Sequence, residues 1–73
     1  MPRLPRVSGR RARRAFERAG WVYSHTTGDH MQLTMPGTRT LVVPDYDVVP
    51  ASILRGSLRT AGLTVDDFVA PLK

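Results

Sequence analysis

Apolar residues recur along the chain at two different spacings, which predict helices around a group of short strands. In residues 8–20, four small or apolar side chains follow a helical spacing: Ala12, Ala15, Phe16 and Ala19. Ser8 is a good N-cap and Gly20 a good stop for this helix. Residues 1–7 contain two prolines and are expected to form an extended lead-in.

The middle of the chain is rich in β-formers and turn residues, and it predicts a three-stranded antiparallel meander. The expected strands are residues 21–25, 30–35 and 39–43, joined by turns at 26–29 and 36–38. In the second strand polar and apolar residues alternate, with His30, Gln32 and Thr34 on one face and Met31, Leu33 and Met35 on the other. The polar face is expected to look away from the helices.

A second helical pattern follows a loop that begins at Pro44. The spacing predicts a helix over residues 51–61, ended by Gly62, that buries Leu54, Leu58 and Ala61. Thr64 is expected to cap a short last helix that packs Phe68 inward and stops at Pro71.

The element order is α-β-β-β-α, which predicts an α+β fold with helices on one face of a small antiparallel sheet. Double-stranded RNA-binding domains share this order. With 73 residues the chain is expected to be one domain over residues 1–73, too small for a deep cleft. Trp21 directly follows the first helix and is expected in the core.

Arginine dominates the charge of this chain. The net charge is +5, and ten of the eleven basic residues are arginine, which suits bidentate contact with phosphate. A polyanion such as nucleic acid is the simplest partner, although coding composition can also produce an arginine bias. Five arginines lie in the first helix, Arg10, Arg11, Arg13, Arg14 and Arg18. Those at the N-terminal end oppose the helix dipole, so either these arginines bind a partner or they form only a solvated basic face.

Composition also excludes several classes of protein. The absence of cysteine excludes disulfides and thiolate chemistry and fits a cytoplasmic location. With two histidines and six scattered acids, neither a metal site nor a bound cofactor is expected. No apolar run approaches the length of a membrane span.

The two histidines carry the candidate chemistry. His25 and His30 flank residues 26–29 and are expected to face each other across that turn, with His30 exposed. RNA supplies its own nucleophile, the 2′-hydroxyl, so cleavage needs a proton-transfer group, and imidazole titrates near neutral pH. Arginines could stabilise the charge that builds on the phosphate. Each histidine could equally be a polar residue beside a turn.

The order and intervals of several short motifs resemble the HicA family of toxins. These motifs are "SGR" at 8–10, "AGW" at 19–21, "GDH" at 28–30, "VP" at 43–44, "LRGSLRTAGL" at 54–63 and "DDF" at 66–68. The resemblance covers nearly the entire chain. It implies a fold like the double-stranded RNA-binding domain and a metal-independent endoribonuclease that cleaves mRNA as the toxin of a type II toxin–antitoxin pair.

The same resemblance implies roles for particular residues. The family's essential histidine matches His30, and its basic residue at the start of the first helix matches Arg10. We expect Arg10, with Arg11 and Arg14, to contact RNA phosphates, and Gly28 to shape the turn that presents His30. A HicB-like antitoxin is the implied protein partner, and it would neutralise the toxin by covering the active surface.

Three positions depart from the family pattern. Asp29 stands where the family has a serine, and a carboxylate there is expected to act on the neighbouring imidazole or on an approaching phosphate. Tyr46 stands where a second histidine is frequent, and Ser57 where a bulky apolar residue is favoured. Two other functions stay open: a module that binds RNA without cutting it, and a degenerate toxin that acts only by binding its antitoxin.

Overall fold

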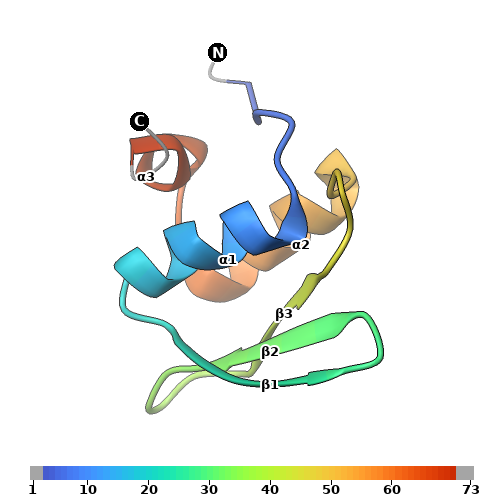
Figure 1. The fold of residues 1–73 in the computed structure, drawn as a ribbon. Helices are drawn as coiled ribbons and strands as arrows, with labels where there is room; N and C mark the ends of the chain where they lie inside the picture. The colour runs from blue at the N-terminus through green and yellow to red at the C-terminus, as the bar shows by residue number, and fades with distance from the viewer. Residues whose placement is uncertain (1–2, 71–73) are drawn as a thin grey trace.

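A three-stranded sheet covered on one side by helices forms the fold, as a computed structural model that describes residues 3–70 shows (Figure 1). The elements follow in the order α1 (Gly9–Arg18), β1 (Val22–Thr27), β2 (His30–Thr34), β3 (Leu41–Pro44), α2 (Ala51–Ala61) and α3 (Val65–Val69). The sheet is antiparallel, with strand order β1-β2-β3. The predicted α+β class and the α-β-β-β-α order are confirmed.

The core lies between the sheet and the helices. Its largest fully buried side chains come from α1, β2, β3, α2 and α3: Phe16, Leu33, Leu41, Val43, Leu54 and Phe68. The rings of Phe16 and Phe68 have centroids 5.3 Å apart, which holds α3 against α1. Trp21 is only 3% exposed, as expected. Ala61 is half-buried rather than buried.

Side-chain caps set the starts of two helices. The Ser8 hydroxyl accepts a hydrogen bond from the Arg11 N–H at 3.1 Å. At α3, Thr64 and Asp67 form a reciprocal capping box, and these hydrogen bonds to Thr64 hold the pKa of Asp67 below its usual value. Gly62 ends α2 as expected, whereas the predicted stop at Pro71 lies outside the described residues.

The first hairpin is tighter than the sequence predicts. β1 continues to Thr27, which pairs with His30 across the two-residue turn Gly28–Asp29. The expected pairing of His25 with His30 is therefore wrong, since His25 pairs with Gln32. Thr26 and Thr27 are β-branched and extend the ladder, and Gly28 adopts φ +59°, which lets two residues close the turn.

The start of α1 packs directly on the end of β3. The Gly9 N–H donates to the Tyr46 carbonyl at 2.8 Å, and a Cβ at Gly9 would lie 1.9 Å from the Pro44 carbonyl oxygen. Only glycine permits this approach. β3 itself begins at Leu41, two residues later than predicted, and includes Pro44, which pairs with His30. The first helix and the start of β2 thus meet at the Pro44–Tyr46 segment.

Candidate functional site

His30 is the first residue of β2. The next residue, Met31, is buried, and side chains alternate along a strand, so the side chain of His30 does not enter the core. The imidazole is exposed, as predicted. Gly28 provides the positive φ of the turn immediately before it, and open space surrounds the position where its Cβ would be.

His25 has a different setting from His30. It is exposed on β1, beside the point where the register with β2 shifts between Tyr23 and His25. Its Nδ1 is 2.9 Å from the Ser24 hydroxyl oxygen, so a neighbouring side chain engages the ring. His25 is therefore the natural comparison for His30: the same residue type on the same sheet, in a different place.

Three arginines of α1 line one hollow of about 520 Å³ against β1, which we call the arginine hollow. Its walls include Arg10, Arg13, Arg14, Tyr23, Thr26 and Asp45. The first helix thus brings Arg10 and Arg14 to the same place, as their i, i+4 spacing predicts. A concentration of guanidinium groups at one hollow suits an anionic ligand such as a phosphate.

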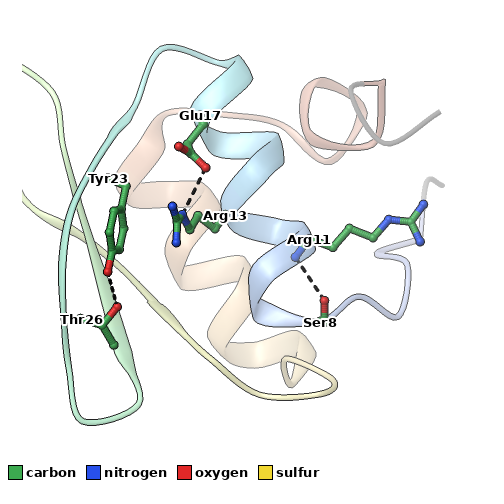
Figure 2. A network of polar contacts seen from close by, with 6 residues as sticks. All are labelled: Ser8, Arg11, Arg13, Glu17, Tyr23 and Thr26. Atoms are coloured by element: carbon green, nitrogen blue, oxygen red, sulfur yellow. Dashed lines mark hydrogen bonds and ion pairs between the residues drawn. The ribbon is translucent and has the colours of Figure 1, made fainter.

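An ordered set of contacts holds the wall of this hollow (Figure 2). The Arg13 guanidinium lies 3.7 Å from the centroid of the Tyr23 ring, and its Nε donates to Glu17 at 3.2 Å. The Tyr23 hydroxyl in turn lies 2.6 Å from the Thr26 hydroxyl. Sequence reasoning did not select Arg13 or Tyr23 as site residues. The i, i+4 pair with Glu17 was the available signal for Arg13.

Asp45 connects the arginine hollow to the hairpin turn. Its carboxylate pairs with Arg10 at 3.4 Å, and its N–H donates to the Asp29 carbonyl at 2.6 Å. The ion pair is largely exposed, so it orients Arg10 more than it stabilises the fold. No feature of the sequence pointed to this pairing.

Arg11 occupies the opposite side of α1 from Arg13 (Figure 2). Its side chain projects away from the hairpin, and it does not line the arginine hollow.

His30 lines a second hollow, of about 400 Å³, which we call the histidine groove. Its walls include His30, Val42 and Tyr46 on the sheet side and Ile53, Gly56 and Thr60 of α2. Among the described residues no arginine lines this groove. The arginines and the imidazole consequently occupy neighbouring hollows. Pro44 and Tyr46 line the histidine groove, and Asp45, which lies between them in the sequence, lines the arginine hollow.

The described part of the chain contains no group of three or more His, Cys, Asp or Glu side chains arranged to hold a metal ion. Across residues 3–70, no helix is long and apolar enough to cross a membrane. The imidazole of His30 can transfer a proton, and the arginines can bind phosphate; together these are the chemical capacities of this surface.

Comparison with known proteins identifies the family. A family model described as the HicA toxin of bacterial toxin–antitoxin systems matches residues 9–63. A search of curated proteins returns no match. The matched region begins at the first residue of α1 and ends just after α2, so it contains the whole sheet, both hollows and His30. The chain belongs to the HicA family of toxins of toxin–antitoxin systems.

Proposed function

We propose that the protein is the toxin of a type II pair and an endoribonuclease that cleaves mRNA without a metal ion, with His30 as general acid or base. One observation carries this proposal. In a chain of the HicA family, an exposed imidazole lines a groove at the start of β2, and a hollow lined by three arginines lies on the other side of the Pro44–Tyr46 segment.

The proposed chemistry uses the substrate's own nucleophile. The 2′-hydroxyl of a ribose attacks the adjacent phosphorus, and the bond from phosphorus to the 5′-oxygen breaks. One proton leaves the 2′-hydroxyl and one reaches the 5′-oxygen, and His30 carries one of these transfers while water carries the other. DNA lacks the 2′-hydroxyl and would not react.

The arginine hollow would hold the phosphates that flank the cut. Arg10 and Arg14 line it together, which supports both as phosphate contacts. Arg11 lacks this support because it does not line the arginine hollow. Gly28 would act indirectly, by closing the turn that places His30 at the head of β2.

The partners follow from the same proposal. The RNA substrate is mRNA, and the site of action is the cytoplasm. A HicB-like antitoxin would neutralise the toxin by covering the face that carries His30. Three arginines line the neighbouring hollow, so an acidic antitoxin surface that reached it would complement their charge.

Incubation of the purified protein with a transcript under excess chelator tests the proposal. We expect the wild type and His25→Ala to cleave, and His30→Ala to cleave about 10²- to 10⁴-fold more slowly while still binding the RNA. Intact RNA with a wild-type protein that binds it would establish a binding module. Absence of both binding and cleavage would favour a toxin that acts only through its antitoxin.

A further inference from the structure

The histidine groove differs in chemistry from the arginine hollow beside it. Its walls are formed mostly by apolar and hydroxyl side chains, and among residues 3–70 only His30 and the phenol of Tyr46 contribute ionisable groups to it. The neighbouring hollow contains three arginines. A single-stranded polyanion presents two kinds of surface, charged phosphates and flat bases. The arginine hollow suits the first, and the histidine groove suits the second.

Gly56 keeps the histidine groove open. It lies inside α2, where glycine lowers helix stability relative to alanine. Its φ is not positive, and no atom lies within 4 Å of the place a Cβ would occupy, so neither backbone conformation nor packing requires glycine there. The lack of a side chain at this position adds to the free space over α2.

Two hydroxyls of α2 line the groove, and the hydrogen of each already makes a hydrogen bond within the protein. Ser57 donates to the Val42 carbonyl at 3.2 Å, and Thr60 donates to the Gly56 carbonyl at 3.2 Å. A hydroxyl has one hydrogen, so each of these oxygens can only accept from a ligand. At this α2 wall a ligand that donates would be favoured over one that presents carbonyl oxygens, whereas the Thr40 hydroxyl, which also lines the groove, can donate as well as accept.

Tyr46 gives the groove an aromatic wall. It is 40% exposed and lines the groove together with His30, so a flat ring beside it would lie next to the imidazole. Stacking of a base on an aromatic side chain is the usual means by which proteins hold unpaired nucleotides.

We infer that the histidine groove binds one unstacked nucleobase of the RNA, next to the phosphate at His30, and prefers a base that carries an exocyclic amino group. The inference rests on the proposed action on RNA. It adds a base-recognition site formed by Tyr46, Gly56 and Thr60. Adenine and cytosine would be favoured over hypoxanthine and uracil, which present a carbonyl oxygen instead.

Binding of fully 2′-O-methylated hexanucleotides tests the inference, because methylation removes the nucleophile and no cleavage occurs. Each probe is a uridine hexamer with adenosine, inosine or cytidine at one central position. We expect the adenosine probe to bind several-fold more tightly than the inosine probe. We also expect it to shift the backbone amide signals of Gly56 and Thr60 in ¹H–¹⁵N spectra.

Variants separate the groove from the rest of the surface. Gly56→Leu fills the groove and should weaken binding of the adenosine probe at least tenfold, whereas Ala51→Leu, an exposed position of the same helix outside both hollows, should stay within about twofold. Thr60→Val keeps the shape and should abolish the preference for adenosine over inosine. Tyr46→Ala should weaken all probes roughly tenfold. A single cooperative unfolding transition in each variant shows that it is folded.

Three results would overturn the inference: amide shifts confined to α1, probe affinities unaffected by Gly56→Leu, or equal binding of adenosine and inosine probes. Amide shifts confined to α1 would indicate instead that the groove receives a side chain of the antitoxin. Each is independent of the nuclease proposal, because none involves cleavage. A His30→Ala protein that cuts RNA at the wild-type rate would refute the nuclease proposal and leave the binding result standing.

Discussion

Gly9→Ala should destabilise the protein severely, although it adds only a methyl group at the start of a helix. The new Cβ would lie 1.9 Å from the Pro44 carbonyl oxygen and 2.9 Å from the Asp45 Cα, whereas Cβ atoms essentially never come within 3.0 Å of other heavy atoms. The two backbones must therefore separate by about 1.1 Å, the difference between 3.0 and 1.9 Å. Both neighbours are main-chain atoms, so no side-chain rotation relieves the overlap.

The cost has two parts. Overpacking of this kind costs about 1–3 kcal/mol, and stretching the hydrogen bond from the Gly9 N–H to the Tyr46 carbonyl costs about 0.5–1.5 kcal/mol. We expect a loss of about 2–4 kcal/mol from a total free energy of unfolding of roughly 4–11 kcal/mol for a chain of this size. The corresponding fall in Tm is about 10–25 °C.

Thermal and urea unfolding measure this prediction, with fluorescence of the single, buried tryptophan, Trp21, as the signal. Gly56→Ala is the matched control, because the same substitution in open space inside α2 should gain about 1 kcal/mol and raise Tm by about 4–8 °C. A Gly9→Ala protein as stable as the wild type would refute the close approach of α1 to β3 that brings the arginines of α1 beside Asp45.

The remaining predictions concern a helix cap and the arginine hollow. Asp67 has a lowered pKa in the folded state, so its contribution to stability is present above its unfolded pKa of about 3.9 and is lost as the pH falls through the lower folded value. In urea unfolding, Asp67→Ala should therefore destabilise the protein at pH 6 but not at about pH 2. Asp66 takes no part in the capping box, so Asp66→Ala should change the stability less. Equal effects of the two substitutions would contradict the capping box. Arg14→Ala should reduce the slope of log affinity for single-stranded RNA against log salt by about 0.7, and Arg59→Ala, which lines neither hollow, should leave the slope unchanged.

Local signals in the sequence located most of the elements. The bounds of α2, residues 51–61, were predicted as observed because Gly62 gives a clear local stop, and Ser8 and Thr64 cap their helices as expected. The alternation in β2 correctly placed Met31 inside and His30 outside. These features depend on neighbours in the chain, which a single sequence displays.

Features that depend on distant contacts were not predictable in the same way. The residues "TTGD" are all good turn formers, so composition could not show that Thr27 joins the strand and that Gly28–Asp29 alone closes the hairpin. The close packing of Gly9 against Pro44 joins segments that are 35 positions apart in the sequence, and it determines where Arg10 lies. The sequence therefore indicated the arginines and the imidazole but not their division between two hollows.

The rate of cleavage at a single phosphodiester bond, under excess chelator and with enzyme in excess over RNA, tests the central claim most directly. We predict that His30→Ala lowers this rate by about 10²- to 10⁴-fold and that His25→Ala, the other exposed imidazole on the sheet, leaves it within a few-fold of the wild type. Equal rates for His30→Ala and the wild type would contradict the assignment of the proton transfer to His30.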